Sequence, residues 1–190
     1  MPIKFLKSAT RIEDLPKSDK PHIVAVGRSN VGKSSLLNDL AKEKNLARVS
    51  SEPGRTQTIN IFDVDGLYFL IDLPGYGFAK TSKAKRDSFA GMIGEYLERT
   101  DRIKLVLLIV DARHGLTELD RDMLAYLGSI DRPVLLVVNK IDKCSKSELA
   151  ALKKSLNAEF PHVAFVFHSS LTSKGRGEIL EEIMRALRFA

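Results

Sequence analysis

The feature that most constrains this chain is the loop Gly27–Ser35, "GRSNVGKSS", which follows the apolar run His22–Val26 and precedes a segment with helical leucine spacing. A strand, the spacing G-x4-G-K-S and a helix, in this order, form the pattern of a phosphate-binding P-loop. Backbone N–H groups of such a loop converge on phosphate oxygens, and the helix N-terminus adds the positive end of its dipole. Lys33 is expected to reach the β- and γ-phosphates, and the Ser34 hydroxyl to bind Mg²⁺. The predicted nucleotide contacts are Gly27, Arg28, Ser29, Asn30, Val31, Gly32, Lys33 and Ser34. The loop alone does not distinguish a kinase, an ATPase and a GTPase.

The rest of the chain alternates between apolar strand-like runs and amphipathic helical stretches, a pattern that predicts a mostly parallel sheet with helices on both faces. The expected strands are His22–Val26, Ile59–Val64, Leu67–Asp72, Lys104–Asp111, Val134–Asn139 and Val163–Phe167. The expected helices are Gly32–Lys42, Lys85–Glu98, Thr117–Leu127, Ser145–Glu159 and Gly175–Phe189. "VDG" at Val64–Gly66 predicts a tight turn that pairs the second and third strands as an antiparallel hairpin. The fold class expected is α/β with a six-stranded sheet.

Length and charge limit the organisation and the partners. The 190 residues fit one domain, so we assign residues 1–20 to an N-terminal extension and residues 21–190 to a single nucleotide-binding domain. The longest apolar runs are too short to cross a bilayer, and the N-terminus has no continuous apolar signal segment, so we expect a cytoplasmic protein without membrane contact. The only cysteine, Cys144, fits a reducing compartment. Thirty Lys and Arg against 24 Asp and Glu give a net charge of +6, which favours polyanionic partners.

A second motif, "IDLPG" at Ile71–Gly75, ends the third expected strand with an acid and a turn. Asp72 is expected to hold Mg²⁺ through its water shell, and the Gly75 N–H to meet the γ-phosphate. Leu73 and Pro74 between them are counted as part of the site. The alternative is that Asp72 only caps the loop and Gly75 only supplies a turn.

A third motif, "VVNKID" at the end of the fifth expected strand, selects the base. The Asp142 carboxylate can accept hydrogen bonds from N1–H and the N2 amine of guanine, whereas adenine would leave it unpaired, which can discriminate by roughly 10⁴-fold. Asn139 is expected to brace the loops, and the Lys140 stem to cover the base, with Ile141 beside them. "FHSSLTSKG" closes the pocket after the sixth strand. Its expected contacts are His168, Ser169 and Ser170, with the serine backbone facing guanine O6 and the histidine side chain packed or at the surface.

The segment "EPGRTQTIN", Glu52–Asn60, lies in a long loop before the second strand. A threonine there can complete the Mg²⁺ shell when a γ-phosphate is present, so the loop would order with GTP and relax with GDP. Thr56 and Thr58 both qualify by chemistry, and either could instead cap the following strand.

Together, in this order, the motifs resemble those of TRAFAC-class GTPases, and more narrowly of the EngB family of bacterial GTPases, from about Ile23 to the C-terminus. The resemblance is carried by "GRSNVGKSSLLN", "PGRTQTIN", "DLPGYG" and "NKID". It implies that Thr56, rather than Thr58, is a metal ligand together with Ser34. It also implies nucleotide-site roles for Gly54, Arg55, Thr56, Gln57 and Thr58, and catalytic roles for Lys33, Thr56, Asp72 and Gly75. The cofactors implied are Mg²⁺ and GTP or GDP.

The resemblance further implies work in assembling the large ribosomal subunit and a role in normal cell division. We expect no added KH domain of the kind that Era-type relatives carry, so rRNA would bind the GTPase surface itself. The basic candidates are Lys80–Arg86, Lys42, Lys44, Arg48, Arg55, Lys174 and Arg176. We expect no DNA partner and a monomer. A rival interpretation is a nucleotide-gated rRNA-binding module whose hydrolysis is incidental, and an ATP-using kinase is disfavoured by Asp142.

The position after Gly75 is Tyr76, where small signalling GTPases carry a water-orienting glutamine, so intrinsic hydrolysis should be slow. In related potassium-activated GTPases, the residue at the position of Asn30 helps to hold K⁺ near the phosphates, which makes K⁺ a further candidate cofactor. The alternative is that Asn30 only braces the P-loop.

Overall fold

The computed structural model describes residues 2–43, 46, 58–77 and 83–188, with side chains from residue 91 onward in the last range. It is an α/β fold with one seven-stranded sheet of order β1-β3-β4-β2-β5-β6-β7. The strands are β1 Ile3–Ala9, β2 His22–Gly27, β3 Ile59–Val64, β4 Tyr68–Asp72, β5 Ile103–Asp111, β6 Val134–Asn139 and β7 Ala164–Phe167. The helices are α1 Lys33–Ala41, α2 Lys83–Arg99, α3 Glu118–Ser129, α4 Lys146–Glu159 and α5 Arg176–Arg188, with short 3-10 turns at Ile12–Asp14 and Ile141–Lys143.

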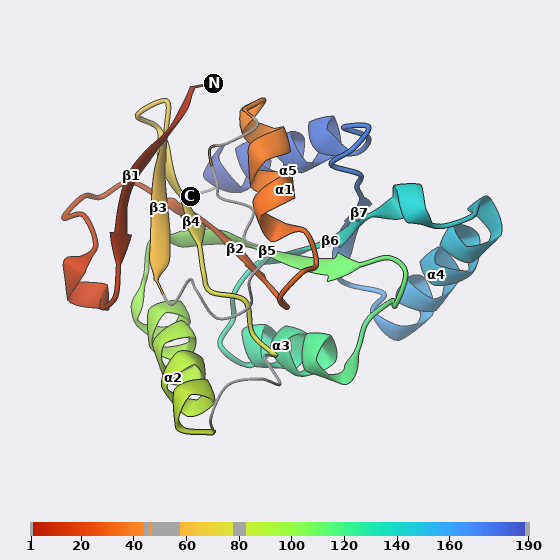
Figure 1. Cartoon of the computed structure of the whole chain (residues 1–190), viewed down its shortest axis with the longest axis horizontal. Helices are drawn as coiled ribbons and strands as arrows, with labels where there is room; N and C mark the ends of the chain where they lie inside the picture. Colours follow the sequence, from red (N-terminus) through yellow and green to blue (C-terminus); the bar gives the residue numbers. More distant parts are fainter. Residues whose placement is uncertain (1, 44–45, 47–57, 78–82, 189–190) are drawn as a thin grey trace.

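Helices cover both faces of the sheet, with α1 and α5 on one side and α2 and α3 on the other (Figure 1). The central strand β2 shows why. Val24 and Val26 pack in one core with residues of α2, α3 and α4, whereas Ile23 and Ala25 pack in the other with residues of α1 and α5. A strand buried on both faces needs a continuous apolar run rather than alternation, which is the pattern of "HIVAV".

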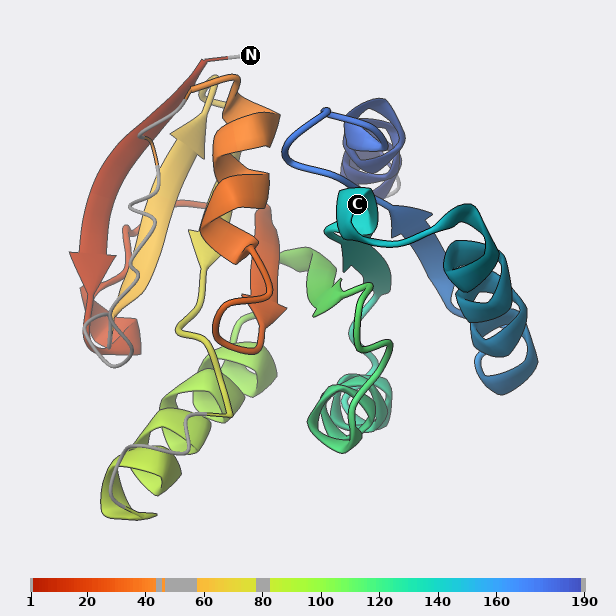
Figure 2. The same cartoon turned by 45° about the vertical axis from the view of Figure 1, so that its right-hand side comes forward.

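Strand β2 is also the point where the chain changes direction across the sheet. It pairs in parallel with β4 on one side and with β5 on the other, and β5, β6 and β7 continue in parallel outward. The loops that leave the carboxyl ends of these strands therefore gather at one edge (Figure 2). Ligands of open α/β sheets bind in the crevice at such a switch point.

The predicted hairpin turn between β3 and β4 is confirmed. Leu67 N–H donates to the Val64 carbonyl at 2.9 Å, and the two strands pair antiparallel. Asp65 and Gly66 have φ of 53° and 71°. Positive φ at both central residues is what a type I′ turn requires, and aspartate and glycine are the residues that tolerate it.

The prediction of six strands is wrong by one. Residues Ile3–Ala9, placed by the sequence in an N-terminal extension, form β1 and pair antiparallel with β3 at the edge of the sheet. The register shifts between Phe5 and Lys7, and only Ile3 and Ala9 of the strand are buried. A bulged edge strand with so few core contacts has no regular period of two, which explains why the hydrophobic pattern did not reveal it. In the part of the chain that is described, no helix is long and apolar enough to span a membrane.

Candidate nucleotide-binding site

The P-loop leaves β2 and wraps the start of α1. Gly27 has no room for a side chain, because a Cβ would overlap the Ile109 carbonyl oxygen of the neighbouring strand. Gly32 precedes α1 with a φ of +95°, and a Cβ there would overlap the Asn139 side chain. Both glycines of the motif are thus required by geometry. The helix begins at Lys33, so its first N–H groups face the loop that the sequence predicts to hold phosphate.

The P-loop lysine forms an ion pair with the acid at the end of β4. Lys33 Nζ contacts Asp72 Oδ1, and the two side chains are 13% and 7% exposed. The Asn60 amide lies 3.5 Å from the other carboxylate oxygen. The two charges that are predicted to serve phosphate and metal therefore neutralise each other in this structure. A buried charge is costly when it has no partner. If a magnesium nucleotide bound here, Lys33 would exchange Asp72 for phosphate and Asp72 would exchange Lys33 for Mg²⁺, so neither charge would be left unpaired.

The oxygen donors near this pair suit Mg²⁺. Asp72 supplies a carboxylate and Ser34, next to Lys33, supplies a hydroxyl, and Mg²⁺ prefers such hard oxygen ligands while keeping several waters. Magnesium bound here would balance the charge of the phosphates. The second proposed ligand, Thr56, lies outside the described residues.

The loop after Asp72 packs directly on the P-loop. Ser29 N–H donates to the Tyr76 carbonyl at 3.2 Å, and a Cβ on Gly75 would lie 2.8 Å from Ser29 Oγ. Glycine is therefore needed at position 75 for this close approach. Leu73 is fully buried and its N–H bonds the Ala25 carbonyl at 3.1 Å, which makes its main role packing. Pro74, between them, is also buried.

A buried carboxylate that the sequence analysis missed ties these loops to α3. Asp120 is 0% exposed. It accepts hydrogen bonds from Arg28 Nε at 3.1 Å and from the Tyr76 hydroxyl at 3.0 Å, as well as from the Thr117 N–H and hydroxyl of its own capping box. Burial raises the pKa of Tyr76 and Asp120 raises it further, so the phenol stays protonated and donates. The pattern "TELD" was a readable signal for a helix start, but not for these distant partners.

The base-recognition motif begins with a buried asparagine. Asn139 is 1% exposed, and its Nδ2 donates to the carbonyls of Val31 and Gly32 at 3.0 and 3.4 Å. The expectation that Asn139 braces the loops agrees with these contacts. These hydrogen bonds hold the end of β6 to the P-loop.

Lys140 lies across the P-loop as well. It has a φ of 64°, and its Nζ contacts the Asn30 carbonyl and lies 2.8 Å from Asp111 Oδ2. Burial would raise the pKa of Asp111, but hydrogen bonds from Arg113 and Lys140 outweigh it and hold that pKa well below its usual range. The ionised Asp111 carboxylate holds the end of the Lys140 side chain. The stem of this side chain is predicted to cover the base.

The predicted guanine acceptor, Asp142, lies in the 3-10 turn after β6 and meets the loop after β7. Ser169 Oγ donates to Asp142 Oδ1 at 2.6 Å. This hydrogen bond holds the pKa of Asp142 below its usual range, which keeps the carboxylate ionised and able to accept. Ile141 is buried, and its N–H bonds the His168 carbonyl. The Ser169 N–H donates to the Lys174 carbonyl at 3.1 Å, so Ser170 becomes the candidate for guanine O6.

His168 is fully buried rather than at the surface. Its Nδ1 lies 2.9 Å from Asn139 Oδ1, and its Nε2 lies 3.0 Å from Asp39 Oδ2. Burial lowers the pKa of His168, and the hydrogen bond with Asp39 acts in the opposite direction. The ring is therefore part of the scaffold behind the base motif.

Several predicted site residues lie outside the described part of the chain, namely Gly54, Arg55, Thr56 and Gln57, together with the basic candidates Lys44, Arg48 and Lys80. Thr58 is described, and its hydroxyl donates to Asn60 Oδ1 at 3.3 Å.

Comparison with known proteins identifies the chain's relatives. A family model described as a 50S ribosome-binding GTPase matches residues 22–140. A probable GTP-binding protein EngB of Pelotomaculum thermopropionicum is 45% identical over 188 residues, covering 96% of this chain and 93% of the relative. Its counterpart in Leuconostoc citreum is 43% identical over 185 residues, covering 95% of each. The chain belongs to the EngB family of GTPases. As a member of that family, it is a GTP-hydrolysing enzyme that binds guanine nucleotides.

Solved structures agree on the P-loop GTPase fold. A crystal structure of a probable GTP-binding protein EngB has a TM-score of 0.74 and 24% identity, covering 89% of this chain and all of the other. Era in complex with MgGDPNP and a segment of 16S ribosomal RNA has a TM-score of 0.71 and 25% identity, and the match covers 87% of this chain and 56% of Era. The α/β fold predicted from sequence is confirmed, with the strand count corrected as described above.

Proposed function

We propose that this EngB-family GTPase acts as a switch in the assembly of the large ribosomal subunit and that normal cell division depends on that work. Its place of action is the cytoplasm, its form is a monomer, and its partners are rRNA and the large subunit or its precursor. The description of the matching family as ribosome-binding supports the partner. The net charge of +6 suits a surface that approaches RNA phosphates.

The observation that best supports the switch role is that two pairs of side chains, Lys33 with Asp72 and Asp142 with Ser169, lie at the same edge of the sheet. Lys33 and Asp72 lie where phosphate and Mg²⁺ are proposed to bind, and Asp142 with its Ser169 partner lies where guanine is proposed to bind. The loop of Gly75 rests on the P-loop at Ser29, so a phosphate that enters beside Lys33 would meet both. A γ-phosphate would then change the packing of this loop, which is how GTPases signal their state.

Co-sedimentation with purified large ribosomal subunits tests the partner and the switch together. We expect the wild-type protein to sediment with the subunits in the presence of a non-hydrolysable GTP analogue more than with GDP or without nucleotide. Lys33→Ala, which removes the phosphate contact common to both nucleotides, should abolish this difference. Equal sedimentation of the wild-type protein in all three states would contradict the proposal.

The rival, an rRNA-binding module with incidental hydrolysis, is favoured by one observation. Tyr76, at the position of the usual water-orienting glutamine, is bonded to Asp120 on α3. Measurement of GTP hydrolysis with and without large subunits separates the two, because strong stimulation supports the switch and unchanged slow turnover supports the module. The same hydrolysis assays, run in KCl and in NaCl at equal ionic strength, also test the proposed K⁺ at Asn30. Equal rates of hydrolysis in the two salts would exclude a role for K⁺.

A further inference from the structure

A buried chain of side chains connects α1 to the P-loop through the base-recognition motif. Its centre is His168, which is 0% exposed and directly follows β7. One ring nitrogen lies 2.9 Å from Asn139 Oδ1 and the other 3.0 Å from Asp39 Oδ2. The three residues come from three separate elements, so their contacts exist only in the folded chain.

The orientation of the Asn139 amide is fixed by its other end. Because Nδ2 donates to the carbonyls of Val31 and Gly32, Oδ1 must face His168. An acceptor oxygen buried against the ring needs a donor, and His168 Nδ1 is the one within reach. Because the Asp39 carboxylate also accepts, the two contacts together require a ring with a proton on each nitrogen, a form that burial opposes and the Asp39 carboxylate favours. If this donor is lost, the amide keeps an unpaired buried oxygen and has less reason to hold its present orientation.

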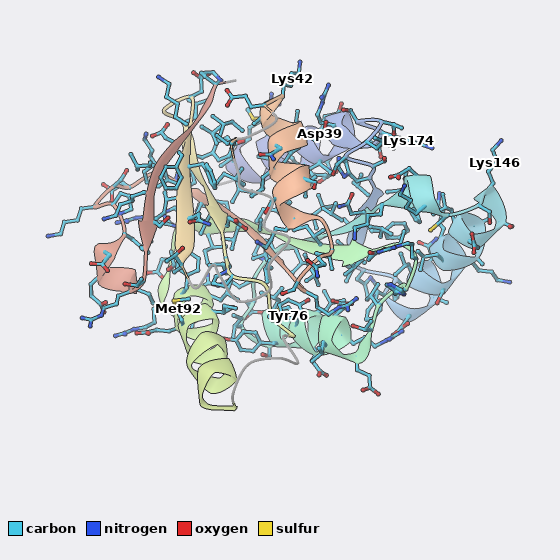
Figure 3. The ribbon with its side chains drawn as sticks, in the orientation of Figure 1. Asp39, Lys42, Tyr76, Met92, Lys146 and Lys174 are labelled. Carbon is cyan, nitrogen blue, oxygen red and sulfur yellow. The ribbon has the colours of Figure 1, made fainter. Side chains whose placement is uncertain are left out.

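The far end of the chain is anchored by two more elements. Asp39 lies on α1 on the side of the loop that carries Lys174 (Figure 3). Its Oδ1 accepts from Ser173 Oγ at 2.5 Å and from Arg176 Nη1 at 3.3 Å. The carboxylate is therefore held by α5 and the loop before it, and it gives His168 a fixed partner.

We propose that His168 is a positioning residue for guanine-nucleotide binding, which holds the Asn139 amide from Asp39 and thereby keeps the base motif and the P-loop in register. This inference rests on the proposed base site of Asn139 and Asp142. The residues that Asn139 holds, Val31 and Gly32, belong to the loop predicted to bind the phosphates present in both GDP and GTP. The affinities for the two nucleotides therefore depend on His168 to the same extent.

Two amide substitutions separate the two contacts of the ring. The Asn amide nitrogen reaches the place of Nδ1, so His168→Asn keeps the donor to Asn139 and loses Asp39. The Gln amide nitrogen reaches the place of Nε2, so His168→Gln keeps the donor to Asp39 and loses Asn139. His168→Phe removes both donors while filling the buried space.

The experiment measures dissociation constants for a fluorescent GDP and for a non-hydrolysable GTP analogue, with the melting temperature of each nucleotide-free variant as a record of folding. We expect His168→Gln and His168→Phe to lower the affinities for both nucleotides equally, by about tenfold, because the buried Asn139 Oδ1 loses its donor. His168→Asn should stay within about threefold of the wild-type protein. The matched controls are His162→Asn and His162→Gln at an exposed histidine.

Equal affinities for the Gln, Phe and Asn variants would overturn the inference, as would losses that follow the melting temperature rather than the Asn139 contact. Asp39→Asn gives a second route that leaves the base motif and the contact between His168 and Asn139 in place, so its affinities for both nucleotides should also stay within about threefold of the wild-type protein. If the wild-type protein itself failed to bind GDP, the proposed base site, rather than the role of His168, would be at fault.

Discussion

Asn139 and Lys140 direct their polar atoms at the P-loop backbone, one through Val31 and Gly32 and the other through Asn30. These contacts join positions more than 100 residues apart, and they leave Asp142, two residues further on, with its carboxylate bonded to Ser169. We therefore propose that the motif residues divide between holding the P-loop and facing the base. The sequence indicated these residues because the motif types carry the chemistry, and their contacts with a nucleotide stay a prediction.

A single buried histidine away from this site should control part of the acid stability. His22 is 3% exposed, its Nδ1 bonds the Tyr96 hydroxyl at 2.7 Å, and its Nε2 has no partner among the described residues. Burial, helped by Arg102, lowers its pKa to about 4. The unfolded chain takes up this proton near pH 6.5, whereas the folded chain resists it, so stability should fall by about 1.4 kcal/mol per pH unit as the pH drops between these values.

Urea unfolding across this pH range measures the effect. His22→Asn should flatten the slope, whereas His162→Asn at an exposed position should leave it as in the wild-type protein. If the free energy of unfolding fell with pH as steeply in the His22 variant as in the wild-type protein, a group other than His22 would be responsible for the pH dependence.

At the scale of elements, α3 is connected to the nucleotide site by one carboxylate. Asp120 joins the first turn of the helix to Arg28 of the P-loop and to Tyr76 of the loop after β4. Both loops are adjacent in the sheet through the bridge between Arg28 and Tyr76. A change in either loop therefore reaches α3 through the buried carboxylate of Asp120.

Removing this carboxylate should be costly. Asp120→Ala would leave the Arg28 guanidinium and the Tyr76 hydroxyl without their acceptor, and we expect a loss on the order of 2–3 kcal/mol of unfolding free energy. The control is Asp122→Ala, which removes an exposed acid from the same helix. Equal unfolding midpoints in urea for the two variants would contradict a stabilising role for the cluster.

At the scale of the whole molecule, the buried part of the fold was predictable and the edge was not. Runs such as Val134–Asn139 are buried on both faces, and their apolar character alone indicates a central parallel strand. Strand β1 exposes Phe5 and Leu6 and carries a bulge, so pairing with β3 rather than burial defines it. Long-range polar pairs such as Asp39 with His168 depend on the folded arrangement of α1 and β7, which no local pattern contains. The site motifs are local in sequence, so their residues could be proposed from it. The contacts that hold these residues in place depend on the fold and could not be predicted.

The most direct test of the central claim, that Asp142 makes this site specific for guanine, is the change in nucleotide preference on Asp142→Asn. The wild-type protein should prefer GDP to xanthosine diphosphate by roughly 10⁴-fold, because the carboxylate accepts from guanine and repels the xanthine C2 carbonyl. The amide of the variant can donate to that carbonyl, so the affinity for GDP should fall and the affinity for xanthosine diphosphate should rise. Asp131→Asn, at an exposed residue whose φ of 53° suits asparagine, serves as the control. An unchanged preference in Asp142→Asn would contradict the account and remove Asp142 from the base site.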